Sequence, residues 1–76
     1  MINVRDKELI QKFGNNLRRL REQKNLSQEE LCYLANLSKN QIGNIERGEV
    51  NATISTVFAL AKALHLDISE LFRFES

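Results

Sequence analysis

The sequence predicts an all-α domain built from five short helices. The chain has 76 residues with no Pro and only 3 Gly, so little in its composition interrupts a helix. Apolar residues recur every three or four positions, which is the spacing of one helix face. Ser, Thr or Asp precedes most of these runs and can cap a helix start. A chain of this length holds one domain, taken here as residues 1–76.

The first two predicted helices are separated by a short break. The first covers about residues 6–24, and Asn25 ends it because Asn tolerates the left-handed backbone conformation. Its apolar stripe is Leu9, Ile10, Phe13, Leu17 and Leu20. Ser27 starts the second helix, since Ser27 and Glu30 have the spacing of a capping box. The predicted buried stripe of the second helix is Leu31, Leu34 and Ala35.

A third helix follows closely on the second. Asn36 ends the second helix, and Ser38 with Gln41 repeats the capping-box pattern two residues later. This third helix runs to about Glu46, with Gly48 just past its end. Ile42 and Ile45 are its inward residues.

Two further helices complete the chain. Thr53 can cap a fourth helix, whose inner stripe is Ile54, Val57, Leu60, Ala61 and Leu64. Asp67 and Glu70 have the spacing to cap a short fifth helix. That last helix carries Ile68, Leu71 and Phe72.

The composition excludes several classes of protein. With 42% hydrophobic and 28% charged residues the chain is typical of a globular domain, and no apolar run approaches the roughly 18 residues of a membrane span. One Cys and one His cannot form an internal disulfide or a structural zinc site, so we expect no metal and no cofactor. Residues 1–47 hold nine Lys or Arg against six acids, giving +3, whereas residues 48–76 hold two against four, giving −2. This asymmetry fits a front half that faces a polyanion.

Catalytic chemistry is not indicated. Glu29 and Glu30 are adjacent, so on a helix they diverge by about 100° and cannot act as an acid/base pair. No Ser/His/Asp set and no Gly-rich phosphate loop is recognisable, and we expect no enzyme. Cys32 is expected to be a packing residue, and His65 a surface residue or a partner of a helix C-terminus.

The second and third predicted helices, 28–35 and 39–46, have the layout of a helix-turn-helix. They are joined by only three residues, and Asn36 suits the left-handed conformation that the joint requires. In this motif, at about residues 27–47, the second helix enters the DNA major groove.

The outward face of helix 39–46 carries groups suited to base edges. With Ile42 facing inward, Asn40 and Asn44 lie on the opposite face, bordered by Gly43 and Arg47, and Lys39 flanks the start. Asn pairs with adenine and Lys or Arg with guanine. Taken alone, the two Asn are equally well explained as solvated residues. Gly43 allows a close approach of the backbone to DNA, or has no function.

The segments LRRLREQKNLSQEEL and LSKNQIGNIERG resemble the Cro/repressor-type, XRE-like helix-turn-helix family, with similarity over roughly residues 10–72. The resemblance implies a lambda-repressor-like fold and DNA binding. The usual Gly residues of the family are replaced by Asn25 and Asn36, and a usual Ala by Cys32. The backbone accepts the two Asn, and Cys32 is expected to be a small buried residue.

The resemblance also implies roles for individual residues. Base contacts would come from Lys39, Asn40 and Asn44, although Lys39 is equally suited to a phosphate. Contacts to the DNA backbone would come from Gln28, Ser38, Gln41 and Arg47. Arg21 and Glu46 match a pair that, in some members, joins the first helix to the end of the recognition helix.

The C-terminal region, at about residues 58–74, is expected to form a homodimer. Leu66, Ile68 and Leu71 suffice for contact with the rest of the domain, which leaves Phe72 and Phe74 facing outward. A twofold interface would cover these rings. The predicted interface consists of Phe58, Leu66, Ile68, Phe72 and Phe74.

Together these features indicate a cytoplasmic, nucleoid-associated transcription regulator that binds a palindromic operator in double-stranded DNA. Restriction–modification controllers and phage or plasmid repressors are the members closest in size and layout, and RNA polymerase is a conceivable further partner. The alternative is an antitoxin-like interaction module that uses the same fold. An acidic or strongly apolar outward face on helix 39–46 would favour that alternative, and neither is present.

Overall fold

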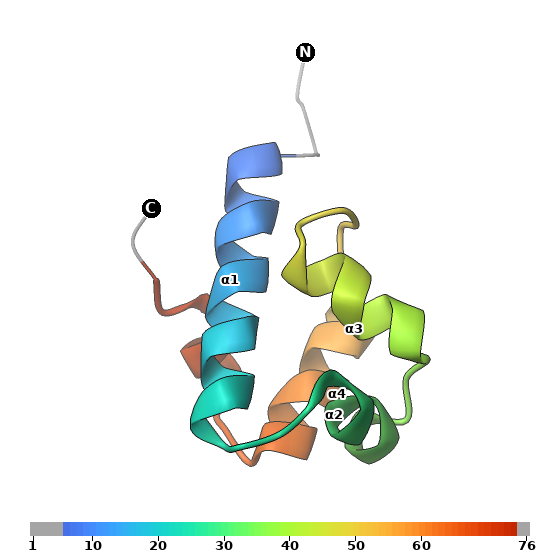
Figure 1. Cartoon of the computed structure of the whole chain (residues 1–76). Helices are drawn as coiled ribbons and strands as arrows, with labels where there is room; N and C mark the ends of the chain where they lie inside the picture. The colour runs from blue at the N-terminus through green and yellow to red at the C-terminus, as the bar shows by residue number, and fades with distance from the viewer. Residues whose placement is uncertain (1–5, 75–76) are drawn as a thin grey trace.

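The computed structural model describes residues 6–74 and confirms the all-α class (Figure 1). The elements are α1 (Lys7–Gln23), α2 (Gln28–Ala35), α3 (Lys39–Glu46), α4 (Ile54–Leu64) and the 3₁₀-helix η1 (Ile68–Phe72). Among the described residues none is in a β-strand, and no helix is long and apolar enough to cross a membrane.

The caps predicted at Ser27 and Thr53 are formed, and Asp6 caps α1 in the same way. Asp6 accepts a hydrogen bond from the Leu9 amide at 3.1 Å, and Thr53 accepts one from Thr56 at 3.2 Å. Ser27 and Glu30 form the reciprocal capping box, with distances of 2.8 and 3.0 Å. These bonds satisfy amides at the helix starts that have no partner within the helix.

Left-handed residues end three segments. Asn25 has φ 59° and Asn36 has φ 57°, as predicted, and His65 at the end of α4 has φ 56°. The role of His65 is therefore to end a helix through its backbone, which the sequence analysis did not predict for a His.

The predicted fifth α-helix is instead a 3₁₀-helix of 5 residues. The Asp67 side chain makes no capping bond, and only the backbone closes the turn, with the Glu70 amide 2.9 Å from the Asp67 carbonyl. Of its apolar residues only Leu71 is buried. So short a segment is held by its contacts with α1 and α4 more than by its own hydrogen bonds.

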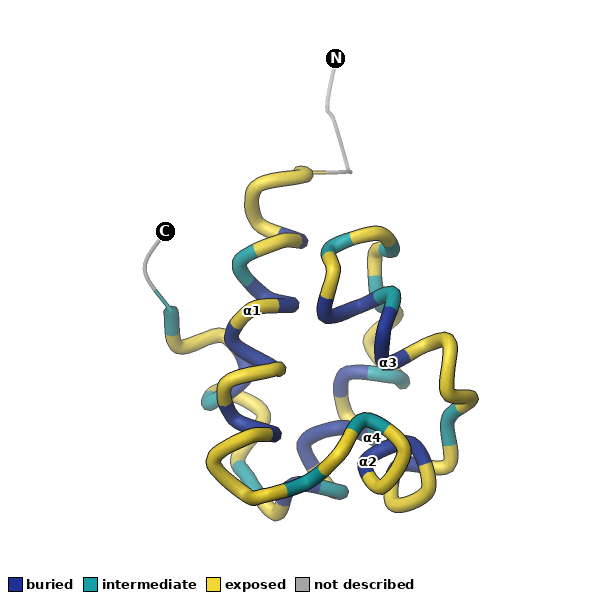
Figure 2. The backbone as a smooth tube through the Cα atoms, in the orientation of Figure 1, coloured by how far each residue is buried: buried dark blue, intermediate teal, exposed yellow. Residues whose placement is uncertain are grey.

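The core lies between α1, α2, α3 and α4, with η1 closing one side (Figure 2). Its fully buried side chains are Leu17, Leu31, Ile42, Leu60, Leu64 and Leu71. Three residues assigned to inner stripes were predicted wrongly: Leu9 is 50% exposed, Leu34 52% and Ile54 86%. Each lies in the first or last turn of its helix, where fewer neighbouring elements cover the side chain.

A close approach of two backbones fixes α1 against α3. A Cβ atom at Gly14 would meet the Ile45 carbonyl oxygen and would lie 2.8 Å from the Glu46 carbonyl oxygen. Only Gly fits at this crossing, because these neighbours are backbone atoms.

Asn16 fixes the C-terminal segment to the same helix. Its buried amide donates to the carbonyls of Glu70 at 3.1 Å and Leu71 at 3.0 Å, and its Oδ1 accepts from Arg19 Nη2 at 2.6 Å. Asn16 was not among the residues predicted to be structurally important. The sequence feature that could have identified Asn16 is its position three residues after Phe13, where a polar amide lies inside the apolar stripe of α1.

Candidate nucleic-acid interface

Helices α2 and α3 form a helix-turn-helix. The three residues between them turn at Asn36, and the Leu37 amide donates to the Cys32 carbonyl at 2.9 Å. At the start of α3 the Ser38 amide donates to Gln41 Oε1 at 2.9 Å. The turn is therefore held by local hydrogen bonds, and α3 begins at a defined position relative to α2.

The inward and outward faces of α3 are those the sequence predicts. Ile42 and Ile45 are buried, and the side chains proposed to face DNA lie at the surface. Lys39, Asn40, Gln41 and Arg47 are exposed, and Asn44 is half-buried. Within the described residues this face carries no acidic side chain of α3, because Glu46 points into the protein.

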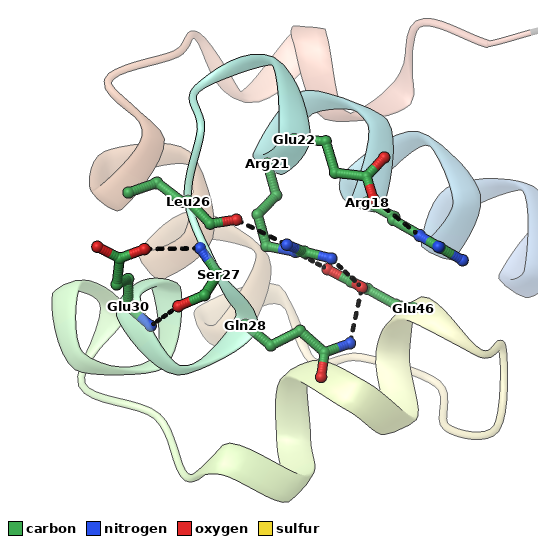
Figure 3. Close-up of polar contacts among 8 residues, drawn as sticks. All are labelled: Arg18, Arg21, Glu22, Leu26, Ser27, Gln28, Glu30 and Glu46. Atoms are coloured by element: carbon green, nitrogen blue, oxygen red, sulfur yellow. Dashed lines mark hydrogen bonds and ion pairs between the residues drawn. The ribbon is translucent and has the colours of Figure 1, made fainter.

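Arg21 and Glu46 form the predicted ion pair, and it is buried (Figure 3). Arg21 Nε donates to Glu46 Oε2 at 2.7 Å, and Nη2 donates to Oε1 at 3.1 Å. Arg21 Nη1 also donates to the Leu26 carbonyl at 2.6 Å. The hydrogen bond to Glu46 raises the pKa of Arg21, which stays charged. The pair joins α1 to the last turn of the recognition helix.

Gln28 also binds Glu46, a contact that the sequence pattern did not predict. Its Nε2 donates to Glu46 Oε1 at 2.9 Å, so the side chain at the start of α2 is oriented by the end of α3 (Figure 3). An amide nitrogen carries two hydrogens, and the second remains available for a phosphate. The predicted phosphate contact is thus compatible with the observed bond.

Two residues that are predicted to contact DNA, Asn44 and Arg47, bind each other at the end of α3. Arg47 Nη2 donates to Asn44 Oδ1 at 2.6 Å, and Arg47 Nε lies 3.2 Å from Glu49 Oε2. At the other end of the helix, Lys39 Nζ lies 3.9 Å from Glu29 Oε2. The Lys39 contact is long and exposed, so it leaves that side chain free to move.

The predicted dimer residues divide into two groups. Phe58 is 55% exposed, Phe72 52% and Ile68 36%, in line with an outward position. Leu66 and Phe74 instead pack, partly buried, against the core. The expectation that Phe74 faces outward is therefore wrong: its ring folds back beside α1, near Lys12 and Arg19.

The outward-facing residues Phe58, Ile68 and Phe72 belong to a larger exposed apolar patch. It consists of Leu9, Ile54, Ile68 and Phe72, together with Phe58, which follows Ile54 by about one turn of α4. A groove of about 270 Å³ runs through it, lined by four of these residues together with Ile10, Phe13, Val50, Asn51, Ala52 and Val57. Phe72 covers one side of the groove, with its ring 5.1 Å from that of Phe13. Leu9 and Ile54, misassigned to the core, thus belong to a surface that the sequence located only in part.

No metal-binding arrangement accompanies these surfaces in residues 6–74. That part of the chain holds no cluster of three His, Cys, Asp or Glu placed to bind a metal ion. Cys32 is buried, and burial raises the pKa of its thiol. The packing role predicted for Cys32 is confirmed.

A helix-turn-helix that presents an amide-rich, basic outer face on its second helix is the structure of a DNA-binding protein of the helix-turn-helix class. The HTH_3 family model, described as helix-turn-helix, matches residues 17–71. The chain belongs to this family of XRE-type transcription regulators, which are not enzymes and which bind DNA through this domain.

Three relatives are similar over most of the chain. Control protein C.SmaI of Serratia marcescens is 45% identical over 59 residues, which are 78% of this chain and 70% of that protein. Control protein C.BamHI of Bacillus amyloliquefaciens is 35% identical over 63 residues, 82% of this chain and 78% of that protein. The crystal structure of the restriction–modification controller C.AhdI from Aeromonas hydrophila matches with a TM-score of 0.82 and 42% identity, over 88% of this chain and 100% of that chain. The lambda-repressor-like fold is confirmed.

Proposed function

We propose that this protein is a restriction–modification controller that binds a palindromic operator as a homodimer in the cytoplasm. The observation that carries the proposal is the outward face of α3, held at a fixed angle by the buried Arg21–Glu46 pair. The controller class is supported by the names of C.SmaI, C.BamHI and C.AhdI, all of which cover most of this chain.

In this proposal each subunit inserts α3 into the major groove. Lys39 and Asn40 contact base edges, because they combine exposure with groups that pair with bases, and the half-buried Asn44 contacts a base from the same face. Gln28, Ser38 and Gln41 contact phosphates on either side, from the starts of α2 and α3. Arg47 contributes at the end of α3.

The partner subunit is proposed to cover the apolar patch. Four of its five large apolar side chains line one groove, and a monomer would leave all five exposed to water. In Figure 1 the C-terminal segment lies on the far side of α1 from α3, whereas the groove residues 50–52 follow α3 in the chain. One recognition helix contacts only a few base pairs, whereas a twofold pair places two helices about 34 Å apart on successive major grooves.

Selection of bound duplexes from a random library tests this proposal. We expect an enriched motif with twofold symmetry and half-sites about one helical turn apart. Enrichment of a single half-site would contradict the dimer. Failure to enrich any motif would contradict sequence-specific binding and favour the antitoxin-like alternative.

A further inference from the structure

Gly43 lies on the outward face of α3, yet it is buried. What covers it is the Arg47 side chain, one helical turn further on. A Cβ atom at position 43 would lie 2.9 Å from Arg47 Nη1 and 3.6 Å from Arg47 Cζ. The guanidinium therefore occupies the space that any other side chain at position 43 would need.

The Arg47 head is held in that space by two neighbours. Its Nη2 donates to Asn44 Oδ1 at 2.6 Å, and its Nε lies 3.2 Å from Glu49 Oε2. The bond to Asn44 matters for DNA because it takes one of the two lone pairs of the Asn44 amide oxygen and holds that oxygen against Arg47. The Nδ2 donors of Asn44 and the remaining donors of Arg47 are then the groups with which this pair can bind a base.

The two side chains together thus offer hydrogen-bond donors. Adenine pairs with an amide that supplies both a donor and an acceptor, whereas guanine presents two acceptors, N7 and O6, in the major groove. We infer that Gly43 determines specificity: by leaving room for Arg47 on the outward face, it makes Asn44 and Arg47 a joint donor group for a guanine. This inference rests on the proposed function, and it assigns Arg47 to base recognition in place of the phosphate contact implied by the family resemblance.

The test compares the motifs selected by the parent protein, by Gly43→Ala and by Arg47→Ala. The parent is expected to select a guanine in each half-site, and replacing it should weaken binding about tenfold or more. Gly43→Ala displaces the guanidinium, so this guanine preference should fall to within about twofold, with the other positions unchanged. Arg47→Ala should lose the same preference.

The double variant Gly43→Ala/Arg47→Ala shows whether Gly43 acts through Arg47. If it does, adding Arg47→Ala to Gly43→Ala changes the guanine preference no further. If the double variant prefers guanine less than Gly43→Ala does, the two substitutions act independently. That result would overturn the inference, because the new methyl group would then act on the base directly. Asn15→Ala, an exposed substitution on α1, is the matched control and should select the parental motif.

The expected loss of the guanine preference in Gly43→Ala would not be caused by unfolding of that variant. Ala is a better helix former than Gly, and the atom it meets is the end of a flexible side chain, so Gly43→Ala should unfold at no lower temperature than the parent. An unchanged guanine preference in Gly43→Ala, or a uniform weakening of all duplexes by Arg47→Ala, would overturn the inference and leave the proposed function standing. A parent protein that enriches no motif would overturn both.

Discussion

The Arg21 guanidinium and the Glu46 carboxylate join α1 to the recognition helix through two hydrogen bonds, 2.7 and 3.1 Å long, in a site almost closed to water. A charge left alone there would be costly, because a buried ion without its partner loses its hydration and gains nothing in return. The pair therefore sets the orientation of α3 more than it adds net stability.

Removing one partner of this pair should destabilise the fold. We expect Arg21→Ala to lower the free energy of unfolding by about 3–5 kcal/mol, because Glu46 stays buried. Urea denaturation measures the change. Arg18→Ala is the matched control, since it breaks an exposed pair with Glu22 and should cost at most about 1 kcal/mol. Equal losses in the two variants would contradict the structural role of Arg21.

Gly14→Ala should also destabilise the fold, even though Ala favours helices. The added methyl group would push against the carbonyls of Ile45 and Glu46, and backbone atoms cannot move aside easily. A net cost of about 1–3 kcal/mol is expected in thermal or urea unfolding. The same substitution at Gly43 meets only a side-chain end and should be neutral or stabilising by up to about 1 kcal/mol. The prediction fails if the two variants are equally stable.

Phe58→Ala should weaken the homodimer without unfolding the subunit, since Phe58 is 55% exposed. Loss of one interfacial Phe is worth about 1.5–3 kcal/mol for each subunit, or at least tenfold in the dissociation constant. Sedimentation equilibrium at micromolar concentration measures this. Tyr33, 86% exposed on α2 and outside the apolar patch, gives the control Tyr33→Ala. A parent that sediments as a monomer, or a stronger effect of Tyr33→Ala, would rule out the proposed interface.

Stability should fall in alkaline solution partly through Cys32. Burial raises the pKa of its thiol, so the unfolded chain loses this proton at a lower pH than the folded protein does. The contribution of the thiol to stability is therefore intact below the unfolded pKa, about 8.5, and is lost as the pH rises from there through the folded pKa. Unfolding free energies at pH 7 and pH 9.5 should differ less for Cys32→Ala than for the parent. An identical pH dependence would show that Cys32 does not contribute.

The helices and caps were predictable because their signals are local. Ser27 with Glu30, Thr53 and the left-handed Asn36 act on residues within one turn, and the sequence displays that spacing directly. The outward face of α3 followed in the same way from Ile42 and Ile45.

The rest depends on contacts between distant segments. Gly14 is required by the Ile45 carbonyl, 31 positions further along the chain, and Gln28 is oriented by Glu46. Ile54 has the spacing of a buried residue, but none of the described elements covers the first turn of α4 at that point, and Ile54 is 86% exposed. Periodicity identifies a face of a helix and does not show where along the helix that face is covered.

The central claim is that α3 recognises a specific DNA sequence, and the affinities of the parent and of Asn40→Ala for the selected duplex and for a scrambled duplex test it most directly. At about 150 mM salt, the parent should bind the selected duplex about a thousandfold or more tightly than the scrambled one. Asn40→Ala should lose about 1–3 kcal/mol on the selected duplex and little on the scrambled one, and its preference should relax at one position of each half-site. Equal affinity of the parent for both duplexes, or an Asn40→Ala variant that keeps the full preference, would contradict the account.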